Sequence, residues 1–289
     1  MASLRDIRQK IGAVKKTQQI TKAMNMVAAS RLRGAQMRME AFKPYATKFG
    51  EVLSGLAGRV EQERFALLRS RPEVKKVEIL VLTADRGLCG SFNMNLINAA
   101  GRFIRELKAQ DKEVSLVCVG KKGRDYFRRR GYNIRQAHVD VMGRFGYDLA
   151  ASLGNDLSNS FISGEADEAY IVHSNFVSAA RQRPICRRLL PISATDVQAK
   201  TGGTEYIFEP SVDVLLETLL PQNVNIQIYD GLLQTNVSEH ASRMASMDNA
   251  TRNCKDMINS LTLTFNKARQ TTITKELMDI VGGAEALRG

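Results

Sequence analysis

The sequence predicts an α/β protein in which two long terminal helices pair as an antiparallel coiled coil and carry an inserted small parallel α/β lobe. Apolar residues recur at heptad spacing over residues 4–42, and residues 232–281 contain neither glycine nor proline. Between these segments, short apolar runs typical of buried strands replace the helical pattern. We therefore predict an N-terminal coiled-coil helix at 1–58, the inserted lobe at 70–205 and a C-terminal coiled-coil helix at 210–289.

The N-terminal helix is predicted from a heptad seam. Its positions are Leu4, Ile7, Ile11, Val14, Gln18, Thr21, Asn25, Ala28, Leu32, Ala35, Met39 and Phe42, and only the three in the middle are polar. Across this polar gap the apolar stripe moves one residue back, to Ile20, Met24 and Val27. We therefore expect the seam to be locally out of phase there.

The ends of this helix also have sequence signals. Ser3 followed by Asp6 predicts a capping box at the start. A helix from Ser3 to Gly58, with Pro44 as a candidate kink, would be on the order of 80 Å long at 1.5 Å per residue. Such a helix is longer than a compact domain of this size would contain.

The C-terminal helix is predicted from one apolar stripe at steps of three or four residues. Its members are Val237, Ala241, Met244, Met247, Ala250, Cys254, Met257, Leu261, Phe265 and Ala268. Many of these side chains are small, which would let a partner helix approach closely. Gly282 and Gly283 predict the end of the helix, and Pro221 and Gly231 predict interruptions within it.

The central lobe is predicted to be small and Rossmann-like. The expected strands are 77–84, 113–120 and 168–175, and the expected helices are 92–110 and 146–162. This alternation favours a parallel sheet with helical crossovers. The segment RPICRRLLPI at 183–192 adds an edge strand, because Pro184 and Pro191 exclude a central position. Residues 121–165 carry little recognisable motif.

The positive charge is concentrated at the N-terminus. The chain has a net charge of +12, and residues 1–43 hold ten Lys or Arg against two acids. This segment implies an anionic partner, which could be an acidic protein surface, nucleic acid or anionic lipid. No apolar run approaches the length of a membrane span, and no export signal precedes the first helix, so we expect synthesis in the cytoplasm without export.

No catalytic, cofactor-binding or metal site is predicted. The most enzyme-like segment, TADRGLCGSFN at 83–93, is a glycine-bearing turn where phosphates often bind. It lacks the lysine of a Walker loop and the three spaced glycines of a dinucleotide fingerprint, so a structural turn is favoured. The four cysteines and three histidines are too scattered for metal ligation or a triad. Asp140, Asp148 and Asp156 have no base or nucleophile at a useful spacing and are interpreted as solvated acids.

Three segments resemble hallmarks of the ATP synthase gamma subunit family. They are KKTQQITKAMNMVAASRLR at 15–33, TADRGLCG at 83–90 and NKARQTTITKELMDIVGGAEAL at 266–287. The third segment agrees with the family signature at each of its defined positions. The resemblance runs the length of the chain in the order of its elements.

The resemblance implies a mechanical role. The two helices would wind through a hexamer of alternating alpha and beta subunits, with the lobe outside it, beside the epsilon subunit and above the membrane c-ring. One copy per complex, without a cofactor, would couple c-ring rotation driven by protons (or sodium ions) to ATP synthesis or hydrolysis at the beta subunits. The complex would be peripheral on the cytoplasmic face of a bacterial inner membrane.

The resemblance also implies contact residues. Those expected to face beta subunits are Lys15, Lys16, Lys22, Met24, Arg269, Gln270, Thr274 and Glu276, and those expected to face the c-ring are Tyr206, Phe208 and Glu209. Each set has an ordinary alternative. Met24 could pack in the seam, the C-terminal group could be solvated, and the third set could form a surface loop.

Two alternative functions remain open at this stage. The first is a basic coiled-coil protein associated with nucleic acid, whose binding would weaken steeply as salt rises. The second is a nucleotide-dependent enzyme built on the central lobe.

Overall fold

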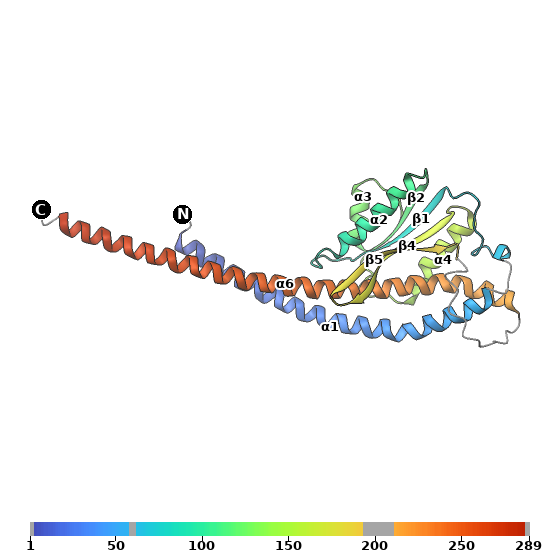
Figure 1. Ribbon diagram of the computed structural model, residues 1–289, viewed down its shortest axis with the longest axis horizontal. Coiled ribbons are helices and arrows are strands. Elements are labelled where there is room, and N and C mark those ends of the chain that lie inside the picture. The colour runs from blue at the N-terminus through green and yellow to red at the C-terminus, as the bar shows by residue number, and fades with distance from the viewer. Residues whose placement is uncertain (1–2, 58–61, 193–210, 287–289) are drawn as a thin grey trace. The chain divides into compact units, whose positions relative to one another are not determined.

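The computed structural model describes residues 3–57, 62–192 and 211–286 (Figure 1). Its elements are α1 (Leu4–Ala57), η1 (Gln62–Arg64), β1 (Lys76–Leu82), α2 (Phe92–Lys108), β2 (Glu113–Val119), α3 (Lys121–Arg129), β3 (Ile134–His138), α4 (Tyr147–Ser163), β4 (Glu168–Ser178), β5 (Arg181–Leu190) and α6 (Val212–Ala286). The chain forms two compact units. The helical unit comprises Met1–Ala28 and Met244–Gly289, and the lobe unit comprises Ala29–Arg243.

The N-terminal cap has the predicted form. The backbone N–H of Ser3 donates to Asp6 Oδ2 at 3.1 Å, and the backbone N–H of Asp6 donates to Ser3 Oγ at 3.2 Å. These two bonds satisfy donors that the first helical turn cannot pair. Helix α1 then continues through Pro44 to Ala57, as expected for one long helix.

The predicted heptad seam is the inward side of α1. All twelve seam positions are buried or half-buried, including the polar residues Gln18, Thr21 and Asn25. The expected phase shift is wrong. Ile20 and Val27 are 60% and 54% exposed, so the seam keeps its phase through the polar segment.

Helix α6 is continuous from Val212 to Ala286, so the predicted interruptions and stop are wrong. Pro221 lies inside the helix, as do Gly282 and Gly283. Gly231 serves a close approach instead of a break, because a Cβ there would lie 2.9 Å from Cδ1 of Ile171.

The apolar stripe of α6 follows the prediction with one exception. Met257 is 53% exposed, and its neighbour Ile258 is half-buried in its place. From Thr251 the inward positions are Thr251, Cys254, Ile258, Leu261, Phe265 and Ala268, spaced at alternating steps of three and four. This spacing is the heptad pattern of a helix that faces a partner.

The lobe is built on a five-stranded sheet with the order β3-β2-β1-β4-β5. β1 pairs in parallel with β2 and β4, β2 pairs in parallel with β3, and β5 is antiparallel to β4. The predicted strands, the two predicted helices and the edge position of the last strand are confirmed. The sequence analysis missed α3 and β3, which lie in the segment without a motif.

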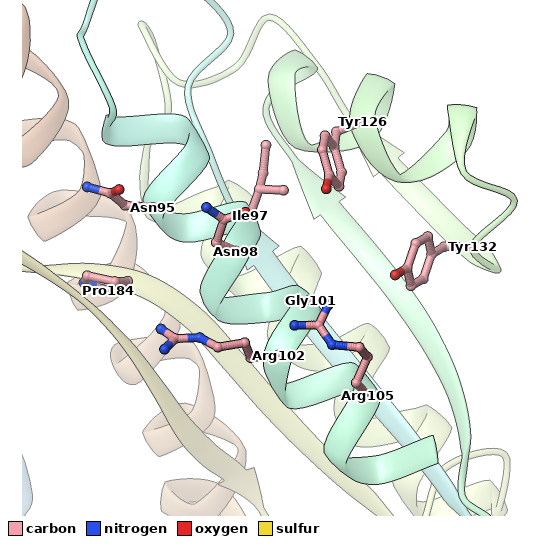
Figure 2. A pocket seen from close by; sticks show the side chains of 9 residues that line it. All are labelled: Asn95, Ile97, Asn98, Gly101, Arg102, Arg105, Tyr126, Tyr132 and Pro184. Carbon is pink, nitrogen blue, oxygen red and sulfur yellow. The ribbon is translucent and has the colours of Figure 1, made fainter. Parts of the chain in front are cut away.

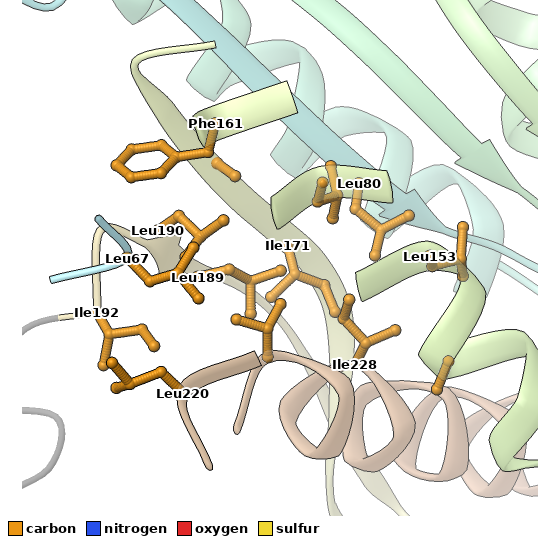
Figure 3. Packing of buried hydrophobic residues seen from close by; sticks show 14 of the residues in the cluster. Leu67, Leu80, Leu153, Phe161, Ile171, Leu189, Leu190, Ile192, Leu220 and Ile228 are labelled. Atoms are coloured by element: carbon orange, nitrogen blue, oxygen red, sulfur yellow. The ribbon is translucent and has the colours of Figure 1, made fainter. Parts of the chain in front are cut away.

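Both faces of the sheet are covered, which explains the continuous apolar strands. On β1, Ile79 faces a cluster with α2 and α3, whereas Leu80 faces a second cluster with α4 and residues 216–233 of α6. Figure 3 shows this second cluster, where Leu80 and Ile171 of the sheet lie near Leu153 of α4 and Ile228 of α6. The lobe is therefore a three-layer structure.

Candidate interaction surfaces

The basic residues predicted on α1 point outward. Lys15, Lys16 and Lys22 are exposed because they lie off the seam. None of them makes an ion pair within the residues that the structure describes. Met24 is half-buried, so its side chain is partly available to a partner.

Polar seam residues hold α1 beside α6 in the helical unit. The hydroxyl oxygens of Thr21 and Thr251 lie 2.8 Å apart, and Asn25 Nδ2 donates to the carbonyl of Met244 at 2.8 Å. Residue numbers rise on one helix as they fall on the other, so the helices run antiparallel here. A buried polar side chain is costly without a partner, and these contacts supply the partners.

No other described part of the chain covers the C-terminal part of α6. Arg269, Gln270, Thr274 and Glu276 are all exposed, and within the described residues none has a side-chain hydrogen bond or ion pair. The apolar residues Ile273, Leu277, Met278, Ile280 and Val281 on the same segment are 49–68% exposed. Such a run of exposed apolar side chains is typical of a surface that a partner covers.

The residues expected to contact a c-ring cannot be placed. Tyr206, Phe208 and Glu209 lie outside the described residues. Their assignment stays a prediction.

The glycine-bearing turn after β1 is organised by an aspartate. Asp85 Oδ1 accepts backbone N–H bonds from Lys121 at 2.9 Å and Asp140 at 2.8 Å, and Oδ2 accepts one from Met142 at 3.0 Å. In an open α/β sheet, donors at this end of the strands are where an anion would bind. Here a carboxylate of the chain already uses them, so the geometry favours a structural turn.

The buried titratable groups among the described residues of the lobe form no catalytic set. Burial lowers the pKa of His173 to about 4, with a further contribution from the positive charge of Arg187. Burial also lowers the pKa of His240 to about 4, helped by Arg243. Among the described residues, the four cysteines are free thiols and His, Cys, Asp and Glu form no group that could hold a metal.

An ionic network around the buried Glu78 was not predicted from the sequence. Arg135 pairs with Glu78 on β1 and with Asp156 on α4, and Gln136 Nε2 donates to Asp156 Oδ1 at 2.9 Å. Asp156 is therefore not a solvated acid, which corrects the earlier interpretation. Burial raises the pKa of Glu78, and Arg135 opposes this shift. The only sequence signal was Glu78 itself, an acid within the apolar run at 77–82.

The comparisons with known proteins agree along the whole chain. A family model described as ATP synthase matches residues 3–287. The gamma chain of ATP synthase from Syntrophobacter fumaroxidans is 55% identical over 292 residues, covering 100% of both chains. The corresponding protein of Nitratidesulfovibrio vulgaris (Hildenborough) is 52% identical over 291 residues, again over 100% of both.

The chain belongs to the ATP synthase gamma-chain family. A solved chain from the Euglena gracilis mitochondrial ATP synthase assembly of OSCP, F1 and c-ring has a similar fold. Its TM-score is 0.68 at 20% identity, over 98% of this chain and 94% of that chain.

Family membership decides between the alternatives. A gamma chain is a non-catalytic stalk subunit of ATP synthase, which agrees with the absence of a predicted catalytic set. The alternative of a nucleic-acid-associated protein has no support from these relatives. Within the described residues, no helix is long and apolar enough to cross a membrane.

Proposed function

We propose that this gamma-chain family member is the central rotating shaft of an F-type ATP synthase. The observation that carries the proposal is the bare C-terminal segment of α6, where polar and apolar residues are exposed together from Arg269 to Val281. A shaft that turns inside a ring must present side chains to its surroundings without binding them permanently. The proton-driven (or sodium-driven) c-ring would supply rotation, and the beta subunits would perform the chemistry.

The contact residues divide into two groups on the shaft. Lys15, Lys16 and Lys22, with Met24 beside them, would meet acidic loops of the beta subunits through screened charge attraction. Arg269, Gln270, Thr274 and Glu276 would form a polar catch that successive beta subunits engage once per step. Support comes from the exposure of the three lysines and of the four C-terminal residues, and from their lack of partners within the described chain.

The catch is tested by Arg269→Ala combined with Gln270→Ala. We expect slower steady-state ATP hydrolysis by the reconstituted complex, with the melting temperature of the free chain unchanged. The matched control is Asn253→Ala with Lys255→Ala, which removes an amide and a cation from exposed positions nearer the lobe. Equal activity of the two double variants would contradict the catch.

We also propose that α1 and α6 form an antiparallel coiled coil, with domains at 1–58, 70–205 and 210–289. The contact of Thr21 with Thr251 supports a register in which Gln18 and the half-buried Cys254 are neighbours one turn further along. A Gln18→Cys variant should form a disulfide with Cys254 under mild oxidation, and Gln19→Cys should not because residue 19 is exposed. Cross-linking of equal yield at both positions would exclude this register.

The assembly partners follow from the family. We infer contacts with the alpha and beta subunits around the shaft, and with the epsilon subunit and c-ring at the lobe, one copy of the chain serving each complex. The complex would be peripheral on the cytoplasmic face of a bacterial inner membrane.

Alanine at Tyr206, Phe208 and Glu209 should weaken c-ring retention and proton-coupled synthesis in membrane vesicles. Unchanged retention would rule out the c-ring contact of these three residues and leave the other proposed contacts in place.

A further inference from the structure

A hollow of about 500 Å³ lies along the outer side of α2 in the lobe (Figure 2). Asn95, Asn98, Arg102 and Arg105 come from one face of the helix, since they are three or four residues apart. Gly101 lies among them and is buried, and its missing side chain keeps the floor of the hollow open. Tyr126 and Tyr132 add two aromatic rings to the lining, and Ile97 and Pro184 are its apolar members.

The hollow is strongly basic. Residues 92–135 contain eleven Lys or Arg and four Asp or Glu, a second centre of positive charge beyond the N-terminal helix. The lining includes two arginines and no acid. Arg102 and Arg105 are exposed and make no ion pair within the described residues, whereas Arg71 and Arg135 of the same lobe are paired with carboxylates. The two guanidinium groups are therefore available to an anion.

The aromatic rings of the hollow are unsuited to stacking on bases. The guanidinium carbon of Arg130 lies 3.8 Å from the ring centre of Tyr126, and Lys108 Nζ lies 5.4 Å from that of Tyr132. Phe127 packs edgewise on both rings, with centroids 5.3 and 5.2 Å away. Single-stranded nucleic acid stacks on free aromatic faces, whereas each of these rings already has a cation and the Phe127 ring against it. Their hydroxyl groups can still donate hydrogen bonds.

We propose that this hollow binds an extended, acidic segment of a partner protein. Arg102 and Arg105 are one turn apart, about 5–6 Å between Cβ atoms, which suits carboxylates two residues apart on an extended chain, about 6.6–6.8 Å. Each guanidinium can hold a carboxylate with two parallel N–H bonds. Asn95 and Asn98 supply carboxamides that can both donate to and accept from the peptide backbone. The site is separate from the stalk role and does not depend on it.

The first test measures binding of a fluorescein-labelled peptide of alternating Glu and Ser to the full-length chain by fluorescence anisotropy. Arg102→Ala with Arg105→Ala should weaken binding by about tenfold, since two charge-assisted contacts are lost. Arg128→Ala with Arg129→Ala is the matched control, because these exposed arginines of α3 lie outside the hollow. Equal losses in the two variants would reduce the effect to general charge attraction and overturn the proposal.

A second variant separates shape from charge. Gly101→Leu fills the floor of the hollow without changing its charge, and the nearest atom to an added Cβ is Arg105 Nη1 at 3.8 Å, the end of a flexible side chain. We expect this variant to keep its melting temperature and lose peptide binding. Retained binding with the floor filled would contradict a site in the hollow.

The third test identifies the occupant in the assembled complex. A photo-cross-linking residue at position 98 should capture a segment rich in Asp or Glu from another protein, and the capture should disappear with Arg102→Glu and Arg105→Glu. A thymidine oligonucleotide of equal charge should compete poorly with the labelled peptide. Efficient competition by the oligonucleotide, or cross-linking to lipid or to a second copy of this chain, would overturn the proposal.

Discussion

The hydroxyl oxygens of Thr21 and Thr251 lie 2.8 Å apart, although 230 residues separate them in sequence. Thr21 Oγ1 also lies 3.0 Å from the carbonyl oxygen of Gln18, and Thr251 Oγ1 lies 2.7 Å from that of Met247. The two hydroxyl groups carry two protons for three contacts, so only two of these can be hydrogen bonds at once. The hydrogen-bonding pattern of this pair is therefore not fixed, and the seam around it is largely apolar.

Replacing one of these threonines should cost more than replacing both. Thr21→Val should lower the free energy of unfolding by about 1 kcal/mol, because the Thr251 hydroxyl keeps the Met247 carbonyl but faces a methyl group in place of the Thr21 hydroxyl. The double variant with Thr251→Val should recover most of that loss through apolar packing. A double-mutant cycle by thermal denaturation measures the coupling, and strictly additive losses would contradict it.

Removing Arg135 should destabilise the lobe in a pH-dependent way. The side chain of Glu78 is 1% exposed, so Arg135→Met leaves a buried carboxylate without its cation and should cost about 2–4 kcal/mol at neutral pH. Burial then raises the pKa of Glu78 in the folded state alone, so the contribution of this carboxyl to the free energy of unfolding should rise as pH falls, against the opposite contributions of His173 and His240.

The control for this prediction is the double variant Glu78→Gln with Arg135→Met, which should lack the gain in stability at low pH. Urea denaturation at several pH values measures both effects. An equal gain in stability in the two variants would show that a titratable group other than Glu78 causes it.

Gly120 should tolerate no side chain. Its φ is +94°, and a Cβ there would overlap the carbonyl oxygen of Thr83. Gly120→Ala should therefore cost at least about 3 kcal/mol by chemical denaturation. Gly131→Ala is the matched control, since φ there is +71° with no atom within 4 Å, and it should cost only about 1 kcal/mol. Equal losses of stability in the two variants would contradict the clash with Thr83 and leave the positive φ as the cause of both.

His173 should make the chain less stable below neutral pH. Its pKa is about 4 when folded and near 6.5 when unfolded, so the unfolded state binds the extra proton between these values. Stability at pH 5 should be about 1–2 kcal/mol lower than at pH 7 from this residue. His173→Phe should reduce that difference, as measured by denaturant midpoints, and part should remain because His240 has the same lowered pKa. An unchanged difference would exclude His173 as the source.

The isolated chain should not bind ATP with micromolar affinity. Asp85 occupies the backbone donors that a phosphate would need, and its negative charge would repel one. Equilibrium dialysis with labelled ATP checks this expectation. Saturable micromolar binding would show a nucleotide site in the lobe.

Periodicity predicted the parts of the fold that packing dictates. The seam of α1 and the strands β1, β2 and β4 were found because buried positions repeat at fixed intervals. β3 was missed because it is a half-buried edge strand whose sequence, IRQAH, has little apolar content. Pro221 and Gly231 were misread because tertiary packing holds α6 together where local propensity would break it.

The interaction surfaces were only partly predictable. The exposure of Arg269 and its neighbours followed from helical spacing, whereas the hollow beside α2 depends on how α3 approaches that helix. The arginines at 102 and 105 could have been noticed as a pair one turn apart. The tyrosines that join them, 126 and 132, come from a segment whose fold the sequence analysis did not predict.

The exposed end of α6 has a consequence for the life of the chain before assembly. A newly made copy displays Ile273, Leu277 and Ile280 to water, and nothing in the described chain shields them. Such a stripe attracts chaperones, proteases and other unfinished subunits. Copies that find no complex would then be degraded first, so the surface that would turn inside the ring would also limit the number of unassembled chains.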